Sequence, residues 1–210
     1  MHFAREGYSR IFGLGIACLV ANLFGFPTLG LVLLALTLFV AFFFRDPERI
    51  APEDERYIIA PADGKVVTIE TNMQEKRFLN ASATRVGIFM SPLDVHVNRV
   101  PISGRVEAVR YHAGQFRPAF AADATEVNEQ NAVTVSDAQG RRVLFVQVAG
   151  ILARRIICHL QGGERVTQGE RYGLIMLGSR VDVYCPPEVH VKVQVGQTVR
   201  AGETVIAEYP

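Results

Sequence analysis

The chain has little that would point to a disulfide framework, a metal site or a nucleic-acid partner. It contains no tryptophan and only three cysteines among 210 residues, namely Cys18, Cys158 and Cys185. They are odd in number, far apart and without a CxxC spacing, which argues against a zinc site and fits a reducing compartment. The 22 Lys and Arg residues nearly balance the 21 Asp and Glu residues, leaving a net charge of +1. We therefore expect no metal ion, and no electrostatic attraction to nucleic acid.

Charge is also absent from one long segment near the N-terminus. Residues 11–44 carry no charged side chain, and Pro27 divides them into two apolar arms. Each arm falls short of the roughly 20 residues of a spanning helix, so a short hairpin, a re-entrant pair and one long kinked helix are all compatible with it. Because arginines flank both ends, we expect residues 1–50 to anchor the chain to the cell membrane from the cytoplasmic side. The alternative is a buried helical pair of a soluble protein.

Residues 51–210 have the pattern of a β-rich domain. Short alternating segments such as RVGIFM, RVLFVQVAG and HVKVQV are separated by Gly, Pro, Asn and Asp, which favours a sandwich or barrel. PADGKVV at Pro61 recurs as PISGRVE at Pro101, and GERVTQGE from Gly163 recurs as GQTVRAGE from Gly196. These echoes predict a duplicated hairpin unit. The fold class is thus mainly β, a duplicated-hairpin β-sandwich or barrel-like domain after an N-terminal apolar helical hairpin.

The duplicated hairpins resemble those of lipoyl- and biotinyl-type carrier domains. One possible function is therefore a membrane-tethered carrier or adaptor module. A carrier needs a lysine at an exposed hairpin tip, and the second half of the chain has only Lys192, inside the alternating segment HVKVQV. The position of Lys192 thus does not match the exposed hairpin tip at which a carrier is modified.

A glycine and a serine interrupt the strand-like stretch YGLIMLGSRVDVYCP. Glycine inside a strand marks a bulge or a close backbone approach. The sequence LGSRVD is not G-x-S-x-G and no helix follows it, so a serine hydrolase using Ser179 is a weak alternative. The Ser179 hydroxyl can instead attack the carbonyl of Gly178, converting the amide to an ester. Loss of the serine α-proton, elimination and hydrolysis then leave a pyruvoyl group at position 179.

Candidate partners for this chemistry lie in two other segments. APADGKVV places Asp63 at a turn before a strand, and SPLDVHVNR gathers Asp94, His96, Asn98 and Arg99 in an otherwise apolar segment. Polar groups so dense near a core need partners or a function. Asp63 as a turn-forming residue and His96 as a structural strand histidine are the plain alternatives.

Together these motifs resemble the phosphatidylserine decarboxylase proenzymes, of the short membrane-anchored type found in bacteria and archaea. The matching segments cover nearly the whole chain in the right order: FFFRDPER, IIAPADGKVV, IFMSPLDVHVNRVPISGRV, ARRIICHLQGGERVTQGERYGLIMLGSRVDVYCP and VKVQVGQTVRAGETVIAEY. The resemblance implies self-cleavage between Gly178 and Ser179 into a β chain of residues 1–178 and an α chain of residues 179–210. It further implies a covalent pyruvoyl cofactor derived from Ser179, and a Schiff base between this group and the amine of phosphatidylserine, which is converted to phosphatidylethanolamine. Family members are commonly homodimers.

The resemblance also assigns site residues by position. Asp63 matches the aspartate of P-A-D-G, and His96 matches the histidine of S-P-x-D-x-H. Longer members have a second histidine three residues on, where this chain has Arg99, so the base for self-cleavage stays open. We expect Asp63 to orient His96 and His96 to act as base and proton donor, and we regard His159 and His190 as structural. Asn98 and Arg99 are expected to bind the phosphate or carboxylate of the substrate; a surface ion pair is the alternative.

Overall fold

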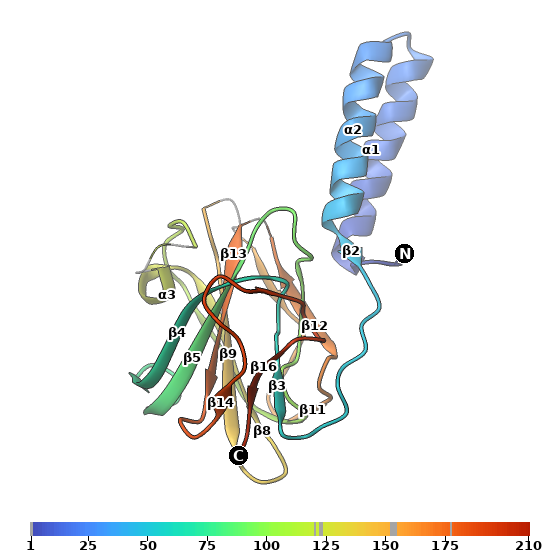
Figure 1. Ribbon diagram of the computed structural model, residues 1–210. Helices are drawn as coiled ribbons and strands as arrows, with labels where there is room; N and C mark the ends of the chain where they lie inside the picture. Colours follow the sequence, from blue (N-terminus) through green and yellow to red (C-terminus); the bar gives the residue numbers. More distant parts are fainter. Residues whose placement is uncertain (1, 120, 122–123, 152–154, 177) are drawn as a thin grey trace. The chain divides into compact units, whose positions relative to one another are not determined.

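The computed structural model describes residues 2–119, 121, 124–151, 155–176 and 178–210. The chain divides into two compact units, Met1–Glu48 and Arg49–Pro210 (Figure 1). The first is helical, and the regular elements of the second are strands apart from the short helix α3 (Ala124–Val127). The prediction of a mainly β chain is confirmed.

The first unit is a helical hairpin. Helices α1 (Arg5–Leu23) and α2 (Pro27–Phe43) are joined by a turn in which Gly25 has φ +78°, and Pro27 suits the first turn of a helix because it has no N–H to lose. Two short strands, β1 (His2–Phe3) and β2 (Arg45–Asp46), pair antiparallel. One long kinked helix is therefore wrong, and both the short hairpin and the re-entrant pair are compatible with this structure.

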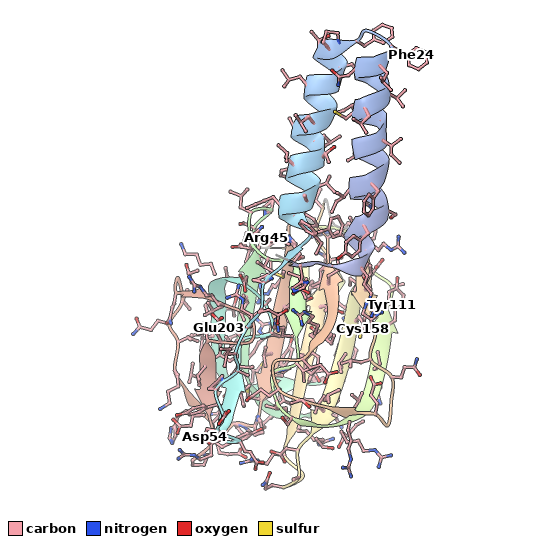
Figure 2. All side chains as sticks on the ribbon, turned by 90° about the vertical axis from the view of Figure 1, so that its right-hand side faces the viewer. Phe24, Arg45, Asp54, Tyr111, Cys158 and Glu203 are labelled. Carbon is pink, nitrogen blue, oxygen red and sulfur yellow. The ribbon has the colours of Figure 1, made fainter. Side chains whose placement is uncertain are left out.

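The helical hairpin exposes an unusual amount of apolar surface. Phe24, beside the turn, is 76% exposed, and its side chain projects from the tip (Figure 2). Further exposed side chains lie along both helices: Phe12, Ile16, Leu19, Leu23, Leu31, Val32 and Leu38. Neither helix, however, combines the length and apolar character needed to cross a membrane, as far as the described residues go. The spanning arrangement is therefore not confirmed, and the anchor stays a prediction.

The second unit is built on one large curled sheet with two small ones (Figure 1). The large sheet has the order β11-β7-β8-β9-β13-β5-β4-β15, and the small sheets have the orders β10-β12-β6 and β14-β16-β3. All pairings between named strands are antiparallel. The strands of the large sheet are β4 (Gly64–Glu75), β5 (Ala81–Met90), β7 (Gly104–His112), β8 (Gln130–Ser136), β9 (Arg142–Val148), β11 (Arg165–Val166), β13 (Ser179–Cys185) and β15 (Thr198–Val199). The other elements are β3 (Tyr57–Ile59), β6 (Val97–Arg99), α3 (Ala124–Val127), β10 (Ile156–Cys158), β12 (Arg171–Ile175), β14 (His190–Val191) and β16 (Val205–Glu208).

The two sequence echoes form equivalent structures at opposite edges of the large sheet. β15 pairs with β4 through Val199 and Gly64, and β11 pairs with β7 through Val166 and Gly104. The equivalent glycines of the two echoes have nearly the same backbone geometry. Gly163 and Gly196 have φ of +94° and +92°, and Gly169 and Gly202 have φ of +81° and +78°. A positive φ suits glycine because it has no Cβ. The duplication is thus present as two matched short strands between glycine turns, but each pairs with a distant strand, so the prediction of a hairpin in each echo is wrong.

β13 lies in the middle of the large sheet, between β5 and β9, and all seven of its residues are buried. Successive side chains of a strand point to opposite faces. Val181, Val183 and Cys185 enter the main core, whereas Arg180 and Asp182 form an ion pair of 2.6 Å that is almost fully buried. Removing one partner of such a pair costs about 3–5 kcal/mol because it strands the other charge.

Cys185 should resist alkylation while the protein is folded. Burial raises the pKa of its thiol to about 12, against 9.0 for an ordinary cysteine. Only the thiolate reacts, so labelling at pH 8 should be on the order of 1000-fold slower than after denaturation. Between these two pKa values the unfolded thiol releases its proton and the folded one keeps it, so the free energy of unfolding should fall as pH rises. Peptide mass mapping after iodoacetamide treatment measures the labelling, and equal native and denatured rates at Cys185 would contradict the burial.

Candidate functional site

The Gly178–Ser179 bond lies at the point where the chain enters the central strand β13. Gly178 has φ +66°, a left-handed conformation that residues with a Cβ adopt only with strain. Ser179 is the first residue of β13, pairs with Met90 of β5 and is completely buried. The interruption seen in the sequence is therefore a sharp change of backbone direction at a serine that water does not reach.

The carbonyl oxygen of Gly178 lies against the backbone of Gly150. Gly150 follows β9, and a Cβ built on it would overlap this carbonyl oxygen and lie 3.4 Å from the Cβ of Ala119. Only glycine leaves room for so close an approach. Sequence reasoning missed this residue, although the glycine after the alternating segment RVLFVQVA was a usable signal. Gly150 thus shapes the space on the carbonyl side of the Gly178–Ser179 bond.

The hydroxyl of Ser179 lies beside a thioether and an amide. Its Oγ donates to Sδ of Met90 at 3.5 Å, and Nδ2 of Asn98 donates to the same sulfur at 3.7 Å. Oδ1 of Asn98 accepts a hydrogen bond of 2.9 Å from Nε2 of Gln147 on β9. The structure therefore brings together Ser179 and Asn98, two of the predicted site residues. Met90 and Gln147 were not predicted, because only the pairing of distant strands places them here.

His96 is the buried histidine of this protein. All five histidines lie in the described part of the chain, and the other four are exposed, including His159 and His190. The Nδ1 atom of His96 lies 2.9 Å from the carbonyl oxygen of Asp94. A carbonyl only accepts hydrogen bonds, so this contact places the proton on Nδ1 and the lone pair of the neutral ring on Nε2. The expectation that His96 acts as a base stays a prediction, and this contact assigns Nε2 as the atom for that role.

The S-P-x-D motif forms the turn that presents this carbonyl group. The Asp94 N–H donates to the carbonyl oxygen of Ser91 at 3.0 Å, and Oδ2 of Asp94 accepts 2.7 Å hydrogen bonds from the N–H and Oγ of Ser91. Local hydrogen bonds of this kind fix the backbone in a turn. Asp94 therefore holds the turn with its side chain and the His96 ring with its main chain.

Asp63 lies in the turn directly before β4 and takes part in a charged cluster. Its Oδ2 forms a 3.0 Å ion pair with Nη2 of Arg49, and its Oδ1 accepts a 2.7 Å hydrogen bond from the N–H of Ala201. Nη1 of Arg49 reaches Glu203, also at 3.0 Å; Glu203 is labelled in Figure 2. The arginine at position 49 belongs to the FRDPER segment but was not predicted to act here. The expectation that Asp63 orients His96 stays a prediction.

Arg99 is the last residue of β6, and its side chain packs on the turn that contains Gly202. It is 5% exposed, and its Nη1 donates to the carbonyl oxygen of Gly169 at 2.9 Å. A Cβ at Gly202 would stand 2.6 Å from Cδ of Arg99, so the arginine stem packs directly on this glycine. Asn98 is likewise fully buried. A surface ion pair, the alternative for these two residues, is therefore wrong; their role in substrate binding stays a prediction.

The groups shown around position 179 are a hydroxyl, a thioether and an amide. Ser179 follows a glycine in a left-handed conformation, and the buried amide of Asn98 shares the Met90 sulfur with its hydroxyl. Among the described residues no group of three or more His, Cys, Asp and Glu side chains is arranged to hold a metal ion. A pyruvoyl group made from Ser179 needs no further ligands, because β13 itself would hold it in place through its pairing with β5 and β9.

Comparisons with known proteins show which family the chain resembles over most of its length. The family model described as phosphatidylserine decarboxylase matches residues 36–207. A relative from Pelodictyon phaeoclathratiforme, named phosphatidylserine decarboxylase proenzyme, is 44% identical over 99% of this chain and 100% of its own length. Proteins of the same name from Chlorobium limicola and Geobacter sulfurreducens are 46% and 47% identical, over 90% and 84% of this chain and 89% and 80% of their own.

Gly150→Ala tests the importance of the close approach at Gly178. The added methyl group has to displace the Gly178 carbonyl group, and a misplacement of about 1 Å at a reacting centre can cost 100-fold in rate. We expect the variant to accumulate as an uncut chain, measured by intact mass over time. Gly162→Ala is the matched control, because its Cβ would meet only one atom, at 3.8 Å. Cleavage of the Gly150→Ala protein at the normal rate, with an unchanged melting temperature, would show that the close approach has no role.

Proposed function

The chain belongs to the phosphatidylserine decarboxylase family, and from this premise we propose that it cuts itself between Gly178 and Ser179 and uses the resulting pyruvoyl group to form phosphatidylethanolamine. The decarboxylation of phosphatidylserine is the activity of the family, and the products are phosphatidylethanolamine and carbon dioxide. The observation that supports the cleavage step is the geometry of one bond. A left-handed glycine precedes a fully buried serine at the start of a strand that is paired on both sides.

Self-cleavage begins with attack by the Ser179 Oγ on the carbonyl carbon of Gly178. The new C–O bond forms as the C–N bond breaks, and the Ser179 nitrogen takes up a proton. A base then removes the α-proton of Ser179, the Cβ–Oγ bond breaks, and residue 178 leaves as a carboxylate. Addition of water to the remaining enamine, through its imine form, expels ammonia and leaves a ketone at position 179. The close approach of Gly150 limits how far the Gly178 carbonyl can move during the attack.

His96 supplies the base in this proposal. The acceptor of the Ser179 hydroxyl in the structure is the sulfur of Met90, a weak acceptor that cannot take the proton. Of the histidines, only His96 is buried as deeply as the serine, and its Nδ1 contact with Asp94 leaves Nε2 as the basic atom. The same atom can return a proton to the substrate carbon after carbon dioxide leaves. Asp63, held by Arg49 and Ala201, supports this side of the site as a fixed negative charge.

The pyruvoyl group supplies a ketone that takes up the substrate amine and an electron sink for the bond to carbon dioxide. The protein contributes orientation and a dry environment. Asn98 offers an amide donor beside position 179, and Arg99, the next residue of β6, offers a guanidinium group. In this proposal these two residues bind the anionic oxygens of the serine head group.

The apolar hairpin brings the catalytic unit to its substrate. A diacyl lipid stays in the bilayer, and the exposed Phe, Leu and Ile side chains of α1 and α2 match a hydrocarbon environment. Arg5 and Arg10 precede the uncharged segment and Arg45 follows it, so we propose insertion from the cytoplasmic face of the cell membrane. Whether two chains form a homodimer stays a prediction.

Two other functions have less support from the structure. A lipoyl- or biotinyl-type carrier needs a free lysine, and Lys192 is engaged with Glu208 in a 2.6 Å ion pair. A serine hydrolase of the G-x-S-x-G type has a helix after the nucleophile, whereas Ser179 begins the strand β13. Family membership and site geometry both favour the decarboxylase.

Ser179→Ala is the direct test of self-cleavage. The wild-type protein should give two masses that meet between residues 178 and 179, and the small chain should react with a ketone reagent such as a hydrazide. The variant should remain one chain and release no carbon dioxide from phosphatidylserine. Ser82→Ala, on the exposed end of β5, is the control and should be cut normally. A wild-type protein that stays uncut and still decarboxylates phosphatidylserine would overturn the proposal.

The same samples show whether the two chains stay together. Cys185 is the only cysteine of residues 179–210 and is fully buried. It should therefore label as slowly in the cut protein as in the Ser179→Ala protein.

His96→Asn separates the base from the contact that holds it. An asparagine Nδ2 can still donate to the Asp94 carbonyl oxygen, but no basic atom remains in place of Nε2. We expect self-cleavage to slow by about 100- to 10,000-fold, the usual contribution of a general base. Intact mass against time measures the rate, and His159→Asn serves as the matched control at an exposed site. A His96→Asn protein that matures at the wild-type rate would remove His96 from this role.

A further inference from the structure

We propose that Gln147 is a positioning residue that fixes which end of the Asn98 amide faces the reactive position, and that Asn98 thereby binds the carboxylate of the substrate serine. This inference rests on the proposed function and extends it to a residue outside the predicted site. Gln147 lies on β9, is completely buried and is the direct cross-strand neighbour of Asn131 and Val181. A fully buried glutamine in a central strand needs partners for both ends of its amide.

The partners of Gln147 fix the orientation of its own amide. Its Nε2 donates to the carbonyl oxygen of Ile157 at 3.3 Å, and its Oε1 accepts from Nδ2 of Asn131 at 3.3 Å. The Ile157 carbonyl can only accept, so the NH2 end of Gln147 has to point toward it. The other hydrogen of this NH2 group goes to Oδ1 of Asn98 at 2.9 Å. Gln147 is therefore held in one orientation before Asn98 is considered.

The orientation of the Gln147 amide determines the orientation of the Asn98 amide. Its oxygen has to face Gln147, so its NH2 group faces the opposite way, toward Sδ of Met90. The same sulfur accepts the hydroxyl of Ser179. A thioether is a weak acceptor, and a buried amide donor without a good acceptor destabilises the fold. The protein thus holds a poorly satisfied donor next to the residue that becomes the cofactor, which is what a binding site for an oxygen atom requires.

The substrate oxygen that fits is a carboxylate oxygen. The substrate amine attaches at position 179, and its carboxylate is bonded to the carbon next to that amine, whereas the phosphate lies farther along the head group. An amide donor holds a carboxylate without the strong stabilisation of a full positive charge, so it can direct the bond that breaks while leaving carbon dioxide free to depart. Asn98 and Gln147 therefore act in decarboxylation, and self-cleavage, which involves no substrate carboxylate, should not need them.

The test uses Gln147→Glu, which keeps the shape of the side chain but replaces the NH2 donor by an acceptor. Asn98 then has to turn its NH2 group toward residue 147 and its oxygen toward the substrate. We expect complete self-cleavage by intact mass, with kcat/KM for phosphatidylserine in detergent micelles lowered by about 10- to 100-fold. Gln139→Glu, an exposed residue on the β8–β9 turn, is the matched control and should retain wild-type turnover. Because a buried glutamate can unfold the protein, Gln147→Met provides a neutral variant without the donor.

A double-mutant cycle separates positioning from general structural damage. If Gln147 acts through Asn98, then Gln147→Met should lower kcat/KM in the wild-type background and have no further effect in an Asn98→Leu background. Multiplicative losses would overturn the proposal, as would normal turnover in both Gln147 variants or failure of a normally melting Gln147 variant to cut itself. The wild-type sample run alongside distinguishes this outcome from failure of the proposed function, which would appear as a wild-type chain that neither cuts nor decarboxylates.

Discussion

The hydrogen-bonded position of β13 between β5 and β9 is the constraint on which the rest of this structure depends. A chain that breaks its own backbone has to keep the new end in place without a covalent link. Here the proposed break falls immediately before a strand that pairs through seven residues with β5 and through five with β9. The side chains of that strand are buried on both faces. A cut before its first residue therefore leaves the pairing of the residues after Ser179 with β5 and β9 in place.

Side chains of β13 alternate between an apolar face in the core and a polar face with an ion pair. Ser179 is followed on the same face by Val181, Val183 and Cys185, which belong to the main core. On the other face Arg180 bonds Thr68 and Asp182, and Asp182 accepts from Thr125. This polar face ties the strand to β4 and to the segment that contains α3, so displacement of the cut end would expose a buried ion pair. Gly87 leaves the space for it, since a Cβ there would stand 2.6 Å from Oδ1 of Asp182.

Much of the fold could be predicted because its signals are local. Alternating segments predicted the strands, and the repeated glycines predicted two matched turns whose positive φ values agree closely. The Gly178–Ser179 step was likewise visible in one short stretch. Met90 and Gln147 were not, because their importance arises only when β5, β9 and β13 lie side by side. A sequence shows that Arg99 is charged but not that it is buried against Gly202, so a surface ion pair was compatible with the sequence and is not with the structure.

The duplication also shows what distinguishes Asp63 from the equivalent residue in the second copy of the turn. Ser103, in the second copy of the turn, accepts the N–H of Gln168 at 2.9 Å, just as Asp63 accepts the N–H of Ala201 in the first. Both side chains therefore hold the facing turn, and the plain interpretation of Asp63 as a turn former has a structural basis. The copies differ in that Asp63 carries a charge and pairs with Arg49. The carboxylate that holds the turn thus also forms an ion pair, and one residue can do both because the hydrogen bond uses one oxygen and the ion pair uses the other.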